Sequence, residues 1–223
     1  MIKSQALSRP FMLRRRDFQT KIRTLIKRGL DVVMAVAGLI ILSPVLLLIA
    51  FVVAADGGPV VFKQPRIGRF GQRFNCLKFR SMNVNADEVL NIYLHENPEA
   101  RAEWRRYQKL KKDPRVTRFG AFLRRTSLDE VPQLLNVLRG EMSLVGPRPF
   151  IPGQEVYYGK NLAAYESVRP GITGPWQVSG RSRRTFAERV VMEAWYAKNW
   201  TLWIDAAILM KTLPALWHRG AAV

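Results

Sequence analysis

Two acidic residues, Asp129 and Glu130, stand side by side in a strongly basic chain. The 223 residues include 36 Lys and Arg but only 17 Asp and Glu, which gives a formal net charge of +19. Arg124 and Arg125 come shortly before the acidic pair, and Arg148 follows it between two prolines. This pattern suits a phosphate-handling site, because a carboxylate oxygen can attack phosphorus or bind Mg²⁺ while guanidinium groups hold phosphate oxygens.

The same carboxylates also fit a structural role. Ser127 and Glu130 have the spacing of a capping box, in which a serine and a glutamate three residues later satisfy the first amides of a helix. The helix dipole also favours acidic residues in a first turn. Spacing alone favours the cap, whereas the scarcity of acidic residues and the nearby Arg148 favour chemistry.

An uncharged apolar segment, residues 32–55, is expected to place this site at a membrane. Roughly 24 helical residues cover about 36 Å, against a hydrocarbon core of about 30 Å. The segment is interrupted at Ser43 and Pro44. Pro44 lacks an amide hydrogen and its ring clashes with the preceding turn, so we expect a kink or break there. The Ser43 hydroxyl or protein packing is expected to satisfy the freed carbonyls.

Basic residues flank the apolar segment on both sides, within residues 21–28 and 63–73. A single crossing would export one of these clusters, against the positive-inside rule. We therefore expect a re-entrant helix that dips into the membrane, turns at Ser43–Pro44 and returns, with a kinked single-pass anchor as the alternative. Asp31, at the mouth of the segment, is expected to be interfacial or paired rather than catalytic.

The positive charge indicates an anionic partner, which could be nucleic acid, acidic lipid or a phosphorylated substrate. Basic clusters directly before the apolar segment, at 14–16 and 27–28, favour the membrane surface. No nucleic-acid-binding signature is evident. The single cysteine, Cys76, excludes an internal disulfide and fits a reducing compartment. With His95 and His218 as the two histidines, a structural zinc site is not expected.

The apolar segment is too long for a cleaved signal and no small-residue cleavage site follows it, so it is expected to remain on the mature protein. The rest of the chain predicts one soluble domain of short, mixed elements. We expect strands at 60–64 and 72–82, helices at 85–112 with a break near 97–98, and short helices at 118–125 and 128–139. After Gly140 the chain is expected to be rich in loops through 146–149 and 169–174. A helix is expected from about Thr185, and an aromatic tail at 195–217 is expected to lie on the membrane or pack on the core.

A set of short motifs follows in order along the chain. They are KRGLD at 27–31, the Ser43–Pro44 pair, KFRSM at 78–82, RRTSLDEVPQ at 124–133, NVLRGEMSLVGPRP at 136–149, RPGITG at 169–174, WQVSGR at 176–181 and Asp205. Together they resemble the bacterial sugar transferase family, the monotopic phosphoglycosyl transferases that start glycan assembly on a polyprenol carrier. The resemblance covers about residues 25 to 215. Larger members carry extra membrane helices and a nucleotide-binding-like region, so this chain resembles the minimal catalytic form.

The resemblance implies an α+β fold. This is a mainly helical, membrane-associated domain with a re-entrant N-terminal membrane helix broken at Ser43 and Pro44, a small β-hairpin and interfacial amphipathic helices. It divides the chain into a basic extension at 1–24, the re-entrant membrane helix at 25–56 and a cytoplasmic catalytic domain at 57–223. It also implies that the protein is located at the bacterial inner membrane, with the catalytic domain on the cytoplasmic face.

The resemblance further implies a role for each candidate residue. Asp129 is the expected nucleophile, and Glu130 is expected to help hold Mg²⁺ or to assist proton transfer. Both carboxylates are candidate metal ligands. Arg148 is expected to bind substrate phosphate, and Arg124 falls on another basic position of the motif with a less defined role.

The expected reaction transfers a sugar 1-phosphate from a UDP-sugar to undecaprenyl phosphate and releases UMP. It begins exopolysaccharide- or O-antigen-type assembly and passes through an aspartyl phosphosugar intermediate, with ping-pong kinetics. Glucose, galactose and N-acetylated or diamino sugars all fit these motifs. Membrane lipids and downstream glycosyltransferases are further candidate partners. Lys78, Arg80 and the arginines near Arg181 are expected to attract the polyanionic substrates.

Other classes of protein compete with this interpretation. A membrane-tethered nucleic-acid-binding protein would explain the charge but lacks a motif. A noncatalytic scaffold for polysaccharide assembly is the stronger rival, although the intact Asp129, Glu130 and Arg148 argue against it. For a glycosyltransferase that moves only the sugar, the sequence has no Asp-x-Asp metal motif, and for a kinase it has no phosphate-binding loop.

Overall fold

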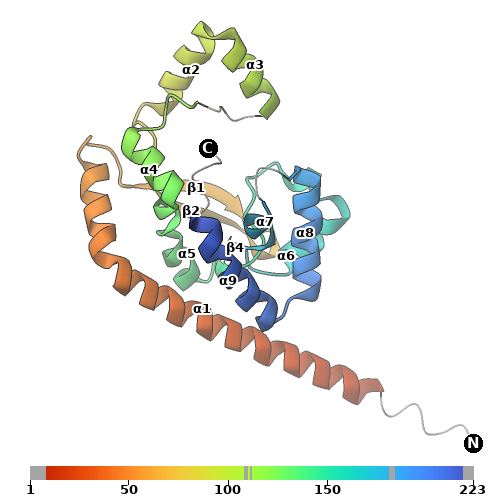
Figure 1. Cartoon of the computed structure of the whole chain (residues 1–223). Coiled ribbons are helices and arrows are strands. Elements are labelled where there is room, and N and C mark those ends of the chain that lie inside the picture. The colour runs from red at the N-terminus through yellow and green to blue at the C-terminus, as the bar shows by residue number, and fades with distance from the viewer. Residues whose placement is uncertain (1–8, 108–109, 111, 181–183, 218–223) are drawn as a thin grey trace, which may run out of the picture.

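The computed structural model describes residues 9–107, 110, 112–180 and 184–217. Within them, a long N-terminal helix runs along one side of a mainly helical domain that contains two two-stranded sheets (Figure 1). The elements in chain order are α1 (Arg9–Ala54), β1 (Val61–Ile67), η1 (Arg69–Gly71), β2 (Arg73–Phe79), α2 (Ala86–Glu96), α3 (Pro98–Tyr107), α4 (Arg118–Thr126), η2 (Leu128–Glu130), α5 (Gln133–Arg139), β3 (Ser143–Val145), η3 (Glu155–Tyr157), η4 (Gly159–Asn161), α6 (Leu162–Glu166), β4 (Gly171–Thr173), α7 (Pro175–Val178), α8 (Phe186–Asn199) and α9 (Leu202–Trp217).

Helix α1 is 46 residues long, includes Pro44 and bends along its course (Figure 1). Pro44 has no amide hydrogen to give to the Ile40 carbonyl. The Ser43 hydroxyl donates to that oxygen instead, at 2.8 Å. The Ser43 hydroxyl therefore satisfies the freed carbonyl, as expected. The break that was one expectation for Ser43–Pro44 is wrong, because α1 continues through Pro44 as one helix. The helix also extends back to Arg9, through most of the expected N-terminal extension, while residues 1–8 lie outside the described part.

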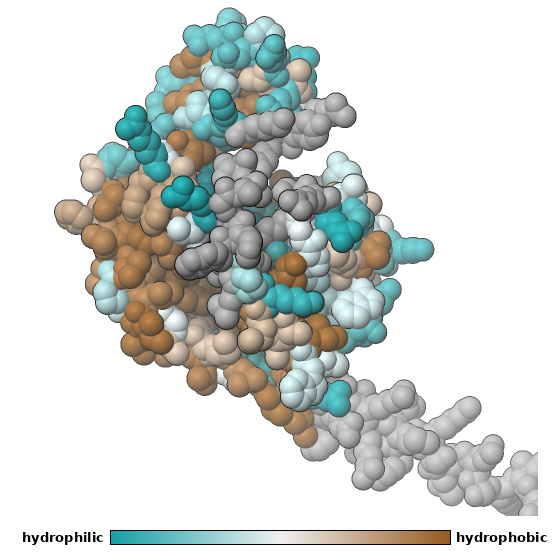
Figure 2. Space-filling view, viewed as in Figure 1, coloured by the Kyte–Doolittle hydropathy of each residue, from teal (hydrophilic) through white to brown (hydrophobic). Residues whose placement is uncertain are grey.

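Both halves of α1 pack against the same domain. Asp31 and Ala35 are buried in the first half, and Ile49 and Val53 are buried in the second. Ala35 joins a core cluster with β2 and α5, whereas Ile49 and Val53 join one with β2 and α4. The stretch Ile22–Ala54 is long and apolar enough to cross a membrane. Its outward face is a band of exposed apolar side chains (Figure 2) that includes Leu25, Val33, Ile40, Ile41, Leu47, Leu48 and Phe51.

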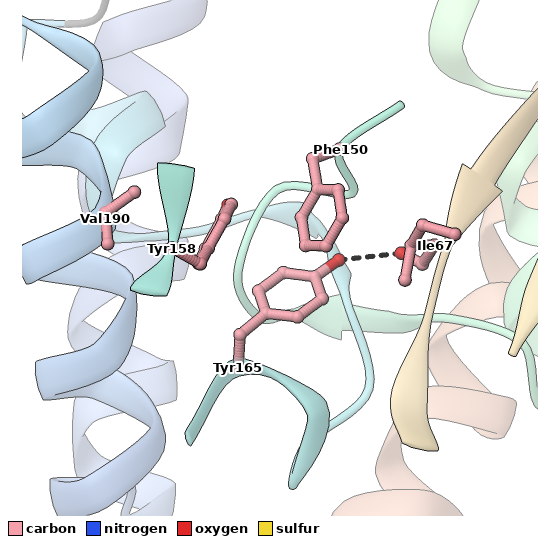
Figure 3. Packing of buried hydrophobic residues seen from close by; sticks show 5 residues of the cluster. All are labelled: Ile67, Phe150, Tyr158, Tyr165 and Val190. Atoms are coloured by element: carbon pink, nitrogen blue, oxygen red, sulfur yellow. Dashed lines mark hydrogen bonds between the residues drawn. The ribbon is translucent and has the colours of Figure 1, made fainter. Parts of the chain in front are cut away.

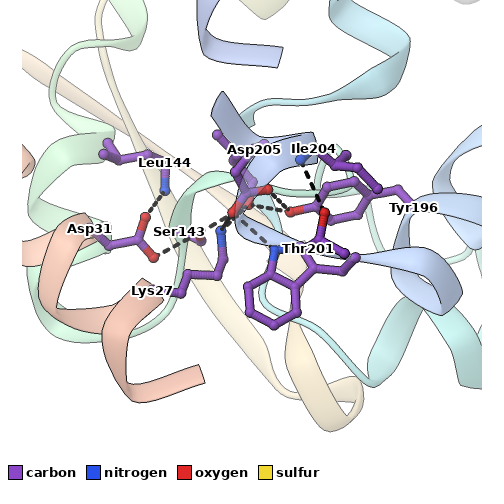
Figure 4. A network of polar contacts seen from close by, with 10 residues as sticks. Lys27, Asp31, Ser143, Leu144, Tyr196, Thr201, Ile204 and Asp205 are labelled. Carbon is purple, nitrogen blue, oxygen red and sulfur yellow. Dashed lines mark hydrogen bonds and ion pairs between the residues drawn. The ribbon is translucent and has the colours of Figure 1, made fainter. Parts of the chain in front are cut away.

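A partly buried ion pair connects the first half of α1 to the C-terminal helices. Lys27 Nζ donates to Asp205 Oδ2 at 2.5 Å and to the Val145 carbonyl at 3.0 Å (Figure 4). Asp205 also accepts from the Tyr196 hydroxyl at 2.6 Å and from Trp200 Nε1 at 2.9 Å. The Asp205 carboxylate is thus fully engaged in holding α1, α8 and α9 together.

Asp31 forms a second link in the same region. Its Oδ2 accepts from the Ser143 hydroxyl at 2.8 Å, and its Oδ1 accepts from the Leu144 amide at 3.0 Å (Figure 4). The expectation that Asp31 is a paired carboxylate is therefore confirmed. We call Lys27, Asp31, Ser143 and Asp205 the α1 clamp.

Asp205→Asn is expected to lower the free energy of unfolding by about 3 kcal/mol, because Lys27 would keep a largely buried charge without its partner. Glu188→Gln is the matched control. Its ion pair with Arg184 is exposed, so little change in the free energy of unfolding is expected. Denaturant unfolding of both variants checks this, and equal losses would contradict the clamp.

The expected hairpin is present, with β1 and β2 antiparallel and Val61 opposite Phe79. Neighbouring residues Cys76 and Leu77 are both buried, so the strand is covered on both faces and its alternation is imperfect. Asn136 of α5 covers the free edge of β2. Its side chain accepts from the Leu77 amide at 3.0 Å and donates to the Asn75 carbonyl at 2.8 Å.

The region expected to be loops contains a parallel pair, β3 and β4, with Ser143 opposite Gly171. The expectation of loops alone is wrong here, because each strand has three residues and is defined by a distant partner. Gly171 makes the pairing feasible. A Cβ atom at this position would lie 2.0 Å from the Gly146 amide nitrogen, so a larger residue would push the strands apart.

An aromatic core supports the loop after β3. Phe150, Tyr158 and Tyr165 pack against one another, and the Phe150 ring centroid lies 4.5 Å from that of Tyr158 and 4.6 Å from that of Tyr165. The Tyr165 hydroxyl donates to the Ile67 carbonyl at 2.8 Å (Figure 3), and Val190 of α8 completes the cluster. This packing holds the segment that carries Arg148 between the hairpin and α8.

The remaining helical expectations are largely confirmed. α2 and α3 are separated at Asn97, and α8 begins after Thr185, which forms a capping box with Glu188. The aromatic tail divides between its two interpretations. Tyr196 is buried and Trp200 bonds Asp205, whereas Trp195 and Trp203 are 53% and 85% exposed. The side chain of Trp217 lies outside the described residues.

Candidate active site

The acidic pair lies on η2, a single 3-10 turn directly after α4. Ser127 joins the two elements in a left-handed conformation with φ of 62°. Its side chain makes no capping hydrogen bond, so the prediction of a capping box with Glu130 is wrong. The turn is closed by the Glu130 amide and the Ser127 carbonyl at 3.1 Å, and the Glu130 carboxylate bonds residues far along the chain instead. A left-handed serine costs about 1–2 kcal/mol, and such strain clusters at functional sites.

Glu130 bridges two cations. Its Oε1 accepts from Lys78 Nζ at 2.9 Å and from Arg148 at 3.0 Å. Burial opposes ionisation of this carboxyl, but Arg148 and Lys78 outweigh it and hold the pKa of Glu130 well below its usual range. Glu130 is therefore an anion at neutral pH that joins β2, η2 and the loop after β3.

Arg148 is held in place by residues that the sequence analysis did not identify. Glu193 of α8 is fully buried and accepts from the Arg148 amide at 3.0 Å. The same carboxylate accepts from Arg189 Nε at 2.9 Å and from the Tyr158 hydroxyl at 2.6 Å. Arg189 in turn donates to the Arg148 carbonyl at 2.8 Å, and the Trp176 ring lies 5.8 Å from the Arg148 guanidinium. The i,i+4 spacing of Arg189 and Glu193 is readable in the sequence, but it does not reveal their target.

Asp129 is buried at 8% exposure on the same turn. Burial lowers the pKa of Arg124, and the nearby charge of Asp129 opposes that shift. Glu130 foremost, and Asp129 as well, raise the pKa of Arg148. Arg124 Nε also donates to the Ser81 hydroxyl at 2.8 Å. The structure therefore brings both expected arginines into the electrostatic range of the acidic pair.

Of the other basic residues expected to attract substrates, Lys78 lies at the acidic pair but Arg80 does not serve that purpose. The Arg80 guanidinium is buried, donates to the Val53 carbonyl at 2.7 Å and pairs with Asp56. It anchors the end of α1, so the expectation for Arg80 is wrong. Arg181 lies outside the described residues.

Arg66 joins the site unexpectedly. It donates to the Pro149 carbonyl at 3.0 Å, next to Arg148. Burial, followed by the charge of Arg148, lowers the pKa of Arg66 to about 10. Arg66 is still a cation at neutral pH, and it adds positive charge around the loop that carries Arg148.

A pocket of about 290 Å³ opens beside Glu130 and reaches α1 at Leu42, directly before the Ser43–Pro44 pair. Apolar side chains such as Val131 and Leu134 form much of its wall. Ser127 also lines it, and its buried hydroxyl has no hydrogen-bond partner among the described residues. The pocket is therefore lined both by Glu130 of the acidic pair and by apolar side chains that include Leu42 of the membrane helix.

The acidic pair supplies oxygen ligands of the kind that Mg²⁺ prefers. Mg²⁺ is usually held by one or two carboxylates together with substrate phosphates. Both ion pairs of Glu130 use Oε1, and Glu130 and Asp129 are the two carboxylates on η2. In the part of the chain that the structure describes, no group of three or more His, Cys, Asp or Glu could hold a metal.

Comparison with known proteins places the chain in a family. A family model described as bacterial sugar transferase matches residues 22–219. The chain is 54% identical over 198 residues to an uncharacterized sugar transferase of Haemophilus influenzae, covering 89% of this chain and 42% of the relative. It is 49% identical over 197 residues to the undecaprenyl-phosphate galactose phosphotransferase of Salmonella typhimurium, covering 88% and 41%.

The chain thus spans about two fifths of the length of these two relatives. A third relative is closer in size. The exopolysaccharide production protein ExoY of Rhizobium meliloti is 49% identical over 191 residues, which cover 85% of this chain and 84% of that protein. The family model and these identities agree with the motifs, and the chain belongs to the bacterial sugar transferase family.

Proposed function

We propose that the protein is a phosphoglycosyl transferase that moves a sugar 1-phosphate from a UDP-sugar to undecaprenyl phosphate and releases UMP. The observation that carries this proposal is the Asp129–Glu130 pair, which lies among Lys78, Arg148 and Arg124, with Asp129 buried and Glu130 lining a pocket that reaches α1. Relatives named as an undecaprenyl-phosphate galactose phosphotransferase and an exopolysaccharide production protein support it. The reaction would begin the assembly of a lipid-linked glycan.

The charges of the two substrates favour a covalent intermediate. A nucleotide diphosphate sugar and a polyprenyl phosphate are both anionic, so direct attack of one on the other works against repulsion. In the first half-reaction, an Asp129 carboxylate oxygen attacks the phosphorus that bears the sugar. The bond from that phosphorus to the bridging oxygen breaks, and UMP leaves with the electron pair, so that a phosphosugar remains on Asp129.

In the second half-reaction, an oxygen of the lipid phosphate attacks the same phosphorus. The bond to Asp129 breaks, the carboxylate is restored and polyprenyl diphosphate sugar is formed. Arg148 and Arg124 hold phosphate oxygens in both steps. Asp129 and Glu130 would hold Mg²⁺ together with the donor diphosphate, where the ion supplies positive charge for the leaving UMP. Lys78 and Arg148 keep Glu130 ionised for this purpose.

The pocket beside Glu130 suits the first isoprene units of the lipid acceptor. Its lining includes Glu130, next to Asp129, and Leu42 on the membrane helix, so an acceptor could place its phosphate near Asp129 while its chain stays near lipid. The unpartnered Ser127 hydroxyl would donate to that phosphate. This contact would explain why a strained serine stands where glycine fits better.

Ser127→Ala and Ser127→Gly are expected to reduce turnover alike, by roughly tenfold to a hundredfold, because both remove one hydrogen bond to a charged group. Their stabilities should differ, since glycine adopts the left-handed conformation without the penalty of about 1–2 kcal/mol. Steady-state kinetics and thermal unfolding of both variants check this. Wild-type turnover in both would contradict the contact with substrate.

We also propose that α1 is re-entrant and that the catalytic domain lies on the cytoplasmic face of the inner membrane. Contacts of both halves of α1 with one domain support this topology, because a helix crossing the bilayer would carry one end away from that domain. The exposed apolar band lies on the opposite face of the helix. The basic flanks on both sides of the segment also favour retention of both ends on one side.

Single cysteines at Thr20 and Arg73, introduced with Cys76→Ala, are expected to react with a membrane-impermeant maleimide in inverted vesicles and not in spheroplasts. Lys160→Cys, at an exposed position of the domain, is the reference for the cytoplasmic side. Labelling of the Thr20 position from the side opposite to Lys160 would contradict the re-entrant helix and support a span.

The activity itself is tested with the purified full chain, Mg²⁺, undecaprenyl phosphate and a panel of UDP-sugars, with the released nucleotide identified. A phosphoglycosyl transferase releases UMP, whereas an enzyme that moves only the sugar releases UDP. UMP release that depends on one or more sugars of the panel supports the proposal. UDP as the product would contradict it, and absence of nucleotide release from every donor would support the scaffold.

A further inference from the structure

A second cavity lies where the first half of α1 meets the domain. It measures about 60 Å³ and shares no lining residue with the pocket beside Glu130. Three arginines from distant parts of the chain line it, namely Arg28 of α1, Arg69 of η1 and Arg169 before β4. We call it the arginine cavity. Its size corresponds to roughly four or five water-sized groups, so it has room for a phosphate group.

Backbone carbonyls, not carboxylates, anchor the three guanidinium groups. Among the described residues, none of these arginines forms an ion pair. Arg69 and Arg169 each use only Nε, so their terminal nitrogens remain available to a ligand. The bonds run from Arg28 to the Val137 and Leu138 carbonyls at 2.6 and 3.0 Å, from Arg69 to the Ser167 carbonyl at 3.1 Å, and from Arg169 to the Gly140 carbonyl at 2.8 Å.

The charges of the cavity are left unbalanced. Asp31 is the carboxylate in its wall, and both oxygens of Asp31 are bonded within the α1 clamp. Lys27 also lines the cavity but is paired with Asp205. Burial, then the charges of Arg69 and Arg28, lower the pKa of Arg169. The arginines therefore repel one another, and a bound anion would relieve that repulsion.

The surroundings of the cavity indicate that this anion belongs to a lipid. On α1, Leu25 and Leu30 flank Arg28 and are 70% and 51% exposed. Phe70 is 68% exposed in a left-handed conformation with φ of 60°, and its ring lies 4.4 Å from the Arg69 guanidinium. Trp200 lines the cavity itself. Apolar and aromatic side chains beside cations are typical of the headgroup level of a membrane.

We propose that the arginine cavity binds the phosphate of an anionic phospholipid headgroup. Terminal nitrogens of Arg69 and Arg169 would take the phosphate oxygens in bidentate fashion, with Arg28 adding charge from α1. The bound lipid would bridge the membrane helix, the hairpin turn and the segment before β4. It would fix the depth at which the first half of α1 lies in the membrane.

The test is a titration of phosphatidylglycerol into the full chain in neutral detergent, with bound lipids counted by native mass spectrometry. Wild type is expected to bind one phosphatidylglycerol saturably and phosphatidylcholine at least tenfold more weakly. Arg69→Gln/Arg169→Gln is expected to lose at least about tenfold in affinity for phosphatidylglycerol. No sugar donor or polyprenyl acceptor is present, so the result is independent of the proposed transferase activity.

Arg73→Gln/Lys160→Gln is the matched control, because it removes the same charge from two exposed positions and should keep wild-type binding. Equal affinity of the two double variants would overturn the proposal. Inorganic phosphate is expected not to compete, and competition at equal concentration would assign the cavity to a free anion instead. If Arg69→Gln/Arg169→Gln fails to fold, Arg69→Gln alone gives the same test, and undiminished binding in it would count against the site.

Discussion

Replacing Asp129 by asparagine is expected to reduce turnover by roughly four orders of magnitude or more, because the amide cannot form the acyl phosphate that links the phosphosugar to the enzyme. Asparagine keeps the shape of the side chain, so the cost in stability is expected to be at most about 1–2 kcal/mol. UMP release in the presence of acceptor, together with thermal unfolding of the same preparation, measures both quantities.

Asp205→Asn is the control for the loss of a buried carboxylate. It removes the same group from the α1 clamp, so it should lower the unfolding temperature and leave the turnover of the folded protein near that of wild type. Near-normal turnover in folded Asp129→Asn would return Asp129 to a structural role on η2.

The second large effect is expected from Glu130→Gln. Glutamine leaves Lys78 and Arg148 close together without the anion that both now contact. We expect a loss of about 3–5 kcal/mol in the free energy of unfolding, a fall in turnover of roughly a hundredfold or more, and an altered dependence on Mg²⁺. Denaturant unfolding and a magnesium titration of activity measure these effects.

A second substitution separates the two roles of Glu130. Glu130→Gln/Lys78→Gln removes the repelling cation, so part of the lost stability should return. Turnover should stay low, because the carboxylate beside Asp129 is still missing. Recovery of turnover along with stability would show that Glu130 acts only by neutralising its neighbours, and would contradict its place in the reaction.

The features that local sequence determines were predictable. The Ser43–Pro44 pair indicated both the backbone hydrogen bond that α1 lacks and the side-chain hydrogen bond that replaces it. Pro44 and Ser43 both lie within four residues of Ile40, whose carbonyl accepts the replacement bond. The two strands of the hairpin and the helix start at Thr185 also follow from nearby residues. In each case the partners are close along the chain, so spacing carries the information.

The same rule explains the failure at Ser127. Ser127 and Glu130 have the spacing of a capping box, and so do Thr185 and Glu188, but only the second pair forms one. The Glu130 carboxylate is instead bound by Lys78, which is 52 residues away. A local sequence pattern does not show that a residue distant along the chain will bind the same side chain in the folded protein.

The residues that position Arg148 could not be predicted from the sequence for a related reason. The two prolines beside Arg148 drew attention to it, but its orientation depends on Glu193, which is 45 residues away and lies in a separate helix. The pairing of Ser143 with Gly171 is likewise long-range. The acidic pair and its arginines could therefore be named from the sequence, while the residues that position them could not.

The central claim, a covalent phosphosugar on Asp129, is tested most directly by the mass of the intact protein after incubation with a UDP-sugar that supports UMP release, with Mg²⁺ and without lipid acceptor. Wild type is expected to gain the mass of one sugar phosphate, with the adduct on Asp129, and to lose it when undecaprenyl phosphate is added. Asp129→Asn should gain nothing. An unmodified wild-type protein under conditions in which the complete reaction runs would contradict the covalent mechanism.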